Sequence, residues 1–146
     1  MEQDILFLRK AIELAKQEKQ EKDEPFGERL VKDSVIVATG QNYVKRNQNP
    51  IAHAELEAIH TYCAQSGMTD LQVYTLYSSC EPCPMCMSAA IWANVGRIVY
   101  SVPAKQAAEK IGSMFQLSSE DLTTHSANKP KLIGPLIQDE GIRVFD

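Results

Sequence analysis

The 146-residue sequence has no apolar run long enough to cross a membrane, and its first residues lack the basic and then apolar pattern of a secretory signal. We therefore expect a cytoplasmic protein without membrane contact. The sequence also has no internal repeat and no low-complexity linker. Its length suits one domain, and we expect a single domain over residues 1–146.

The sequence also has no excess of positive charge. Lysine and arginine total 15 and aspartate and glutamate total 19, which gives a formal net charge of -4. Nucleic acids are polyanions, so an acidic balance argues against nucleic acid as the main partner. A local basic patch is still compatible with this composition.

Cysteine is sparse, with four residues in the chain. Cys80, Cys83 and Cys86 lie in one short segment. In a reducing compartment, such clustering indicates metal binding rather than disulfides. The fourth, Cys63, falls on the apolar face of a predicted helix, where we expect a core position.

Apolar residues at helical spacing predict helices, and runs of β-branched and aromatic residues predict strands. We expect helices over residues 4–19, 51–65, 83–93 and 104–111, with one more inside 117–127. We expect strands over residues 30–31, 35–38, 71–77 and 97–102, a turn at 32–34 and loops at 41–50 and 78–82. This order of elements predicts an α/β fold, a three-layer α/β/α sandwich around a central mixed sheet.

Two short motifs carry the chemistry, namely His53-Ala54-Glu55 and Pro82-Cys83-Pro84-Met85-Cys86. Cys83 and Cys86 are three apart at a helix start, so they share one face, and the helix dipole favours their thiolates. With His53 they make three ligands for a tetrahedral zinc ion, which leaves the fourth position open, as in catalytic sites.

Zinc makes a bound water acidic enough to supply hydroxide near neutral pH, and a neighbouring carboxylate can carry the proton. Glu55 is the candidate. The pattern H-x-E followed by P-C-x-x-C is the signature of zinc-dependent nucleobase deaminases. If Cys80 were a fourth ligand the site would be purely structural, but it precedes Pro82 and should lie off the face of Cys83 and Cys86.

These motifs, together with Pro25-Phe26-Gly27 and Gly40-Gln41-Asn42, resemble the cytidine deaminase-like superfamily. The resemblance is greatest to its guanine deaminase and nucleoside deaminase branch, which is related to the tRNA adenosine deaminases. It implies a five-stranded sheet, a homodimer, one Zn²⁺ per chain and hydrolytic release of ammonia from a nucleobase or nucleoside. It also implies that zinc is held by residues His53, Cys83 and Cys86, with Glu55 as the proton shuttle.

The resemblance further implies four substrate contacts. Phe26 matches a pocket-lining position, Asn42 matches one that hydrogen-bonds the base, and Ala54 matches one whose backbone N–H meets the substrate. Trp92 matches either a pocket position or a core position.

The substrate implied is a purine such as guanine or guanosine. The alternatives are the wobble adenosine of tRNA, and cytosine or cytidine. Two departures from the family pattern leave the base open: Glu28 stands where the family usually has a small residue, and residues 113–116 lack the acidic side chains expected of a guanine deaminase.

Overall fold

The computed structural model describes all 146 residues. Its helices and strands run in the order α1 Glu2–Gln20, β1 Gly27–Lys32, β2 Val35–Gln41, α2 Ala54–Ser66, β3 Thr75–Cys80, α3 Pro84–Trp92, β4 Arg97–Val102, α4 Ala104–Ile111, α5 Ser119–Thr124, β5 Lys131–Ile133, α6 Gln138–Ile142 and the 3₁₀ helix η1 Arg143–Phe145.

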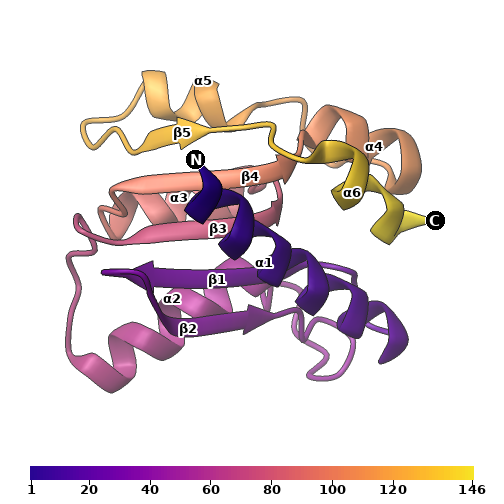
Figure 1. The fold of residues 1–146 in the computed structure, drawn as a ribbon, viewed down its shortest axis with the longest axis horizontal. Coiled ribbons are helices and arrows are strands. Elements are labelled where there is room, and N and C mark those ends of the chain that lie inside the picture. The colour runs from indigo at the N-terminus through magenta and orange to yellow at the C-terminus, as the bar shows by residue number, and fades with distance from the viewer.

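The five strands form one sheet in the spatial order β2-β1-β3-β4-β5 (Figure 1). Strand β1 pairs antiparallel with both β2 and β3, whereas the β3–β4 and β4–β5 pairs are parallel. The parallel pairs need crossover connections, and α3 supplies the one between β3 and β4. The predicted mixed five-stranded sheet is confirmed.

Helices cover both faces of the sheet, as predicted for a three-layer sandwich. Figure 1 shows α1 in front of the strands and α2 and α3 behind them. Successive strand residues point to opposite faces, so each central strand contributes to both cores. The residues that face α2 and α3 include Leu30, Leu76 and Ile98. The residues that face α1 include Val31, Tyr77 and Val99.

The β1–β2 hairpin turns through Asp33 and Ser34, whose φ angles are +51° and +64°. Two residues with positive φ make the tight turn whose twist suits a hairpin. The predicted turn is therefore confirmed, although both strands are longer than the sequence indicated.

The prediction of a strand over residues 71–77 and a loop over 78–82 is wrong in its boundaries, because β3 runs over Thr75–Cys80. Leu71 and Tyr74 are buried in the core without belonging to the strand. Ser78 and Ser79 are also buried, despite their polarity. They are tolerated there because their hydroxyls are hydrogen-bonded, to Glu28 and to the Gly27 backbone N–H respectively.

The C-terminal third is built from short elements. The helix expected within residues 117–127 is the six-residue α5, and its N-terminus carries a capping box between Ser118 and Asp121. β5, α6 and η1 were not predicted. None of the helices combines the length and the apolar character that crossing a membrane requires.

Candidate active site

The predicted metal ligands lie at the starts of two helices. His53 is the residue immediately before α2 and Cys83 the one immediately before α3, and both have extended backbone angles. Pro84 occupies the first turn of α3, where its missing N–H costs nothing. Cys86 lies three residues after Cys83, one helical turn further on. Both helices lie on the same face of the sheet (Figure 1).

The three ligand atoms form a compact triangle. Cys83 Sγ and Cys86 Sγ are 3.6 Å apart, and His53 Nδ1 lies 3.7 Å from the first and 3.4 Å from the second. A tetrahedral zinc with Zn–S near 2.3 Å and Zn–N near 2.0–2.1 Å would separate two sulfurs by roughly 3.8 Å and a sulfur from a nitrogen by roughly 3.6 Å. The donor set and its spacing therefore fit a zinc ion, and the three residues are positioned to hold it.

The same three side chains perturb one another electrostatically. Contact with Cys86, and then with His53, lowers the pKa of Cys83 to about 4. The neighbouring Cys83 raises the pKa of His53, and Cys83 and burial together raise the pKa of the Cys86 thiol. One thiolate therefore forms at neutral pH without further help, and a bound cation would favour the second.

Glu55 is the second residue of α2 and is 7% exposed. Burial, and then the charge of Cys83, raises the pKa of its carboxyl to about 7. The carboxyl thus lies beside the metal ligands in a place where it can bind or release a proton near neutral pH.

Cys80 does not join the ligand group. It is the last residue of β3, it is buried, and it packs against Val102 and Ala107. Burial raises the pKa of its thiol, which keeps it protonated. Cys63 lies on α2 and packs against the main core while partly buried. Cys63 therefore packs against the core, as the sequence predicted. Cys80 lies apart from the ligands, also as predicted, and its packing role is a finding of the structure.

Phe26 lies just before β1 and its ring meets that of Phe145, with centroids 5.9 Å apart and an interplanar angle of 61°. An edge-to-face pair of this kind fixes both rings. The C-terminal residues therefore reach the position that was predicted to line the pocket. Phe145 was missed by the sequence analysis because its partner lies at the other end of the chain.

Asn42 follows β2 and is 1% exposed. Its side-chain oxygen accepts a hydrogen bond of 3.0 Å from the Val44 backbone N–H. The amide NH₂ is thus the group that Asn42 has left for a ligand, and it can only donate. Ala54 is the first residue of α2 and is fully buried, and its backbone N–H belongs to the unpaired donors of a helix start.

Trp92 ends α3 and is 87% exposed, so it does not belong to the core of this chain. It lines a shallow surface hollow with Ile91, Leu122 and Asn128. Its contact with substrate stays a prediction.

Glu28, the departure noted in the sequence, lies on β1 and is 1% exposed. Its Oε2 accepts a hydrogen bond of 2.7 Å from Ser78 Oγ, and its Oε1 has no partner. Burial, and then the charge of Glu55, raises its pKa well above the ordinary value. A second carboxyl with a perturbed pKa therefore lies close enough to Glu55 for the two charges to interact.

Glu81 anchors the short loop that leads from β3 to Cys83. Its two oxygens accept hydrogen bonds of 2.9 Å from the backbone N–H groups of Ala104 and Ser119, the first residues of α4 and α5. Its own N–H donates to the Val102 carbonyl. These contacts join the approach to Cys83 to two helices that no sequence pattern connects with it.

Comparison with known proteins places this site in a family. Residues 1–102 match the family described as "Cytidine and deoxycytidylate deaminase zinc-binding region". Guanine deaminase of Bacillus subtilis is 46% identical over 85 residues, which are 58% of this chain and 54% of the relative. The tRNA-specific adenosine deaminase of the same species is 31% identical over 140 residues, which are 96% of this chain and 84% of the relative. A probable cytosine deaminase of Schizosaccharomyces pombe is 30% identical over 148 residues, 97% of this chain and 89% of the relative.

Solved structures of deaminases are also similar to this chain. The crystal structure of the Bacillus subtilis guanine deaminase is 42% identical, with a TM-score of 0.69 over 71% of this chain and 67% of that one. The guanine deaminase of Nitrosomonas europaea is 23% identical and shows the shared fold, with a TM-score of 0.85 over 95% of this chain and 80% of that one. The zinc-fitting triangle and the matched family together identify the chain as an enzyme of the cytidine and deoxycytidylate deaminase zinc-binding family.

Proposed function

We propose that residues 1–146 form a single deaminase domain that hydrolyses the exocyclic amine of a nucleobase or nucleoside. In this proposal His53, Cys83 and Cys86 hold zinc and Glu55 carries protons. The observation that carries it is the triangle of one nitrogen and two sulfurs, at 3.4–3.7 Å, with a buried carboxyl two residues from the histidine. Three protein ligands leave a coordination position open, as catalytic sites require.

Zinc, when bound, lowers the pKa of water enough to provide a nucleophile near neutral pH. Glu55 would accept one proton from the attacking water and pass it to the ring nitrogen next to the carbon under attack. It would then take the second proton from the hydroxyl group added to that carbon and pass it to the amine, which departs as ammonia while the C=O bond forms. One water is consumed, a C–N bond is replaced by a C–O bond, and Glu55 returns to its starting state.

The same proposal assigns the groups that orient the base. Asn42 donates through its amide NH₂, since its oxygen is already engaged with Val44. Ala54 donates through its backbone N–H at the start of α2. Phe26 supports the flat ring through apolar contact. A base that lacks the acceptor for Asn42 would leave a buried donor unpaired, which disfavours the wrong substrate.

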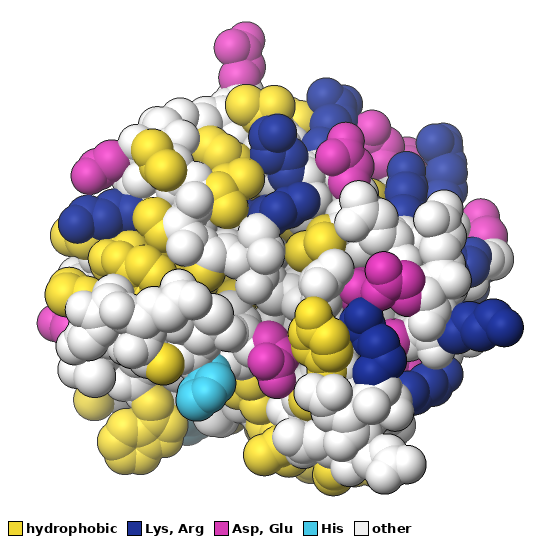
Figure 2. Space-filling model, turned by 90° about the horizontal axis from the view of Figure 1, so that it is seen from below, with side chains coloured by type: hydrophobic (Ala, Val, Ile, Leu, Met, Phe, Trp, Pro, Cys, Tyr) yellow, Lys and Arg dark blue, Asp and Glu magenta, His cyan; other side chains and the backbone are white.

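We propose a purine such as guanine or guanosine as the substrate. The identity of 46% to a guanine deaminase is higher than the 31% and 30% to the tRNA-specific adenosine deaminase and the probable cytosine deaminase. The net charge of -4 also favours a small substrate over a nucleic acid. On the face drawn in Figure 2, lysine and arginine side chains lie among acidic ones rather than in a continuous basic patch.

The tRNA wobble adenosine is the second candidate, because the match to a tRNA-specific adenosine deaminase extends over 96% of this chain. Cytosine or cytidine is a further alternative, on the match to the probable cytosine deaminase. A tRNA substrate would bind with an affinity that falls steeply as salt rises. Ammonia release from guanine, guanosine, cytosine, cytidine and a tRNA anticodon stem-loop, measured side by side, separates these candidates.

Glu55→Gln tests the reaction itself. It removes the proton carrier while keeping the size of the side chain, and we expect kcat to fall by about 10²–10⁴-fold with one zinc still bound per chain. Glu57→Gln is the matched control, because Glu57 lies in the same first turn of α2. Turnover by Glu55→Gln equal to that of Glu57→Gln would exclude the role assigned to Glu55.

We further propose that the enzyme is a cytoplasmic homodimer, as the resemblance implies. The four cysteines are free thiols, which suits a reducing compartment. Trp92 is exposed beside the partly buried Ile91 on α3, and an unpaired apolar surface of this kind suits contact with a second copy. Sedimentation equilibrium of the wild type and of Trp92→Ser measures the association.

A further inference from the structure

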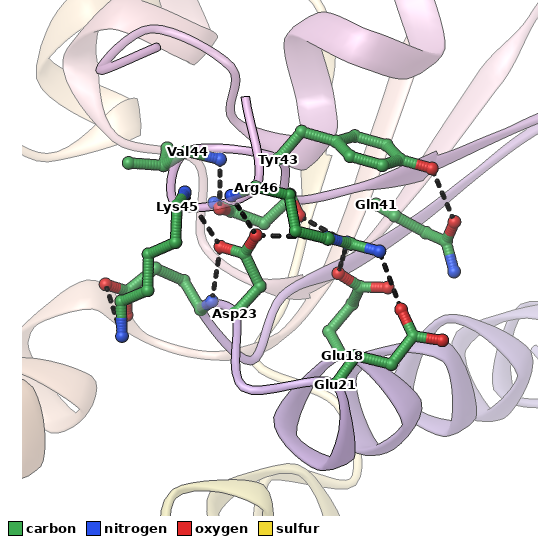
Figure 3. Close-up of polar contacts among 10 residues, drawn as sticks. Glu18, Glu21, Asp23, Gln41, Tyr43, Val44, Lys45 and Arg46 are labelled. Carbon is green, nitrogen blue, oxygen red and sulfur yellow. Dashed lines mark hydrogen bonds and ion pairs between the residues drawn. The ribbon is translucent and has the colours of Figure 1, made fainter. Parts of the chain in front are cut away.

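Arg46 lies in the loop between β2 and α2, and it bonds to three acidic side chains in and just after the last turn of α1 (Figure 3). Its Nη1 donates to Glu21 at 2.6 Å and its Nε donates to Asp23 at 3.1 Å. Its Nη2 donates to Glu18. The guanidinium thus joins the loop to the last turn of α1 and to the residues just after it through three charge-assisted bonds, which are the strongest kind available to it.

The partners of Arg46 are held firmly. Glu18 is fully buried and Asp23 is 4% exposed. Asp23 also accepts from the backbone N–H groups of Glu24, Lys45 and Arg46, at 2.9–3.4 Å. A carboxylate with this many donors has little freedom to move, and it therefore provides a rigid anchor for the loop.

The guanidinium also contacts Asn42 directly. Arg46 Nη2 donates a hydrogen bond of 2.6 Å to the Asn42 backbone carbonyl, and the guanidinium lies 4.2 Å above the centre of the Tyr43 ring. Tyr43 in turn donates from its backbone N–H to the Ala52 carbonyl at 2.9 Å, one residue before His53. Asn42 therefore has its backbone fixed by Arg46 and its side-chain oxygen fixed by Val44.

We propose that Arg46 is a positioning residue for substrate binding, because it anchors Asn42 to the end of α1 and so fixes the direction in which the Asn42 amide donates. This inference rests on the proposed role of Asn42 in holding the base. Lysine cannot replace arginine here, because a single ammonium cannot reach three carboxylates and a carbonyl in the fixed fork geometry of a guanidinium.

The test is a double-mutant cycle of Arg46→Lys and Asn42→Ala on the full chain, with the substrate found in the ammonia-release panel. Arg46→Lys keeps the charge that Glu18 and Asp23 need, so it is preferred to Arg46→Ala, which would leave buried carboxylates uncompensated. We expect Arg46→Lys to raise KM about 10-fold, with a much smaller change in kcat and with zinc still at one per chain. Lys45→Ala is the matched control, because this adjacent cation is exposed and meets Glu24 only at 3.9 Å.

If Arg46 acts through Asn42, Arg46→Lys has no further effect on KM in the Asn42→Ala background, because coupled residues are non-additive. Independent, multiplicative effects would overturn the inference, since a residue that only stabilises the fold behaves in that way. An unchanged KM in Arg46→Lys, or a raised KM in Arg46→Lys when Asn42→Ala alone changes nothing, would overturn it as well.

Hydrogen–deuterium exchange of the substrate-free protein provides a readout that does not depend on activity. We expect Arg46→Lys to speed exchange of the Tyr43 and Val44 amides, while Lys45→Ala leaves them unchanged. Faster exchange in Arg46→Lys together with no turnover of any base by the wild type would refute the proposed function but retain the anchoring of Asn42. Unchanged exchange would refute the anchoring itself.

Discussion

Gly40, near the end of β2, allows the start of α2 to lie directly against the sheet. A Cβ atom at this position would be 1.9 Å from the Ala54 carbonyl oxygen and 3.0 Å from the Ala58 Cβ. The nearer atom belongs to the backbone, so no side-chain rotation can remove the clash. Gly40→Ala can therefore be accommodated only if α2 moves away from the sheet.

The size of that movement follows from the geometry. Ordinary contact with a Cβ begins at 3.4 Å, so the Ala54 carbonyl would have to retreat by about 1.5 Å. His53 and Glu55 flank Ala54 and would move with it, whereas Cys83 and Cys86 belong to the start of α3. Metal sites tolerate ligand shifts of about 0.2 Å, and a misplacement of about 1 Å can reduce catalysis about 100-fold.

We therefore expect Gly40→Ala to bind zinc weakly, to lose about 100-fold in kcat/KM, and to be destabilised by about 1–3 kcal/mol. Gly112→Ala is the matched control. Gly112 has φ +77° and ψ 175°, and no atom lies within 4 Å of the place that a Cβ would take, so alanine there causes only local backbone strain of about 1–3 kcal/mol.

The measurements are zinc per chain after dialysis, kcat/KM, and the free energy of unfolding in urea. Comparable loss of stability in the two variants, with loss of zinc in Gly40→Ala alone, is the expected result. A Gly40→Ala protein that holds zinc and turns over substrate as well as Gly112→Ala does would show that the position of α2 against β2 does not set the ligand geometry.

Two further predictions concern the cysteines and Glu28. Cys86→Ala should lose the zinc that Cys80→Ala retains at one per chain, as metal analysis would reveal; equal zinc loss in both would contradict the assigned ligand set. Burial raises the pKa of Glu28 in the folded state, so its contribution to stability is lost as pH rises from the unfolded pKa through the folded one. In urea titrations, the free energy of unfolding of Glu28→Gln minus that of the wild type should therefore be more favourable to the variant at pH 8 than at pH 4. The same difference at both pH values would refute this.

The part of the site that depends on local sequence could be predicted. Cys83 and Cys86 are one helical turn apart, so their shared face follows from helix geometry wherever the helix lies in the fold. His53 and Glu55 are two residues apart at a helix start. Their meeting with the cysteines is a tertiary contact, and it was predicted only because the two motifs together form a known signature.

The anchors of the site could not be predicted, because each depends on a partner distant in the sequence. Arg46 reaches back 28 residues to Glu18, and Glu81 reaches forward 38 residues to Ser119. In the sequence, Glu18 belongs to a run of charged residues that is typical of a solvated helix end. Only the fold reveals that one of these carboxylates is fully buried.

The distribution of these contacts explains why the reaction is easier to recognise than the substrate. The family match covers residues 1–102, which include the metal ligands and Glu55 but exclude Phe145. Phe145 nevertheless packs against Phe26, a residue that we propose contacts the substrate. Under that proposal, a substitution in the C-terminal residues changes the wall of the pocket without changing any motif of the family. For the same reason, identity within the motif region supports deamination more strongly than it supports guanine.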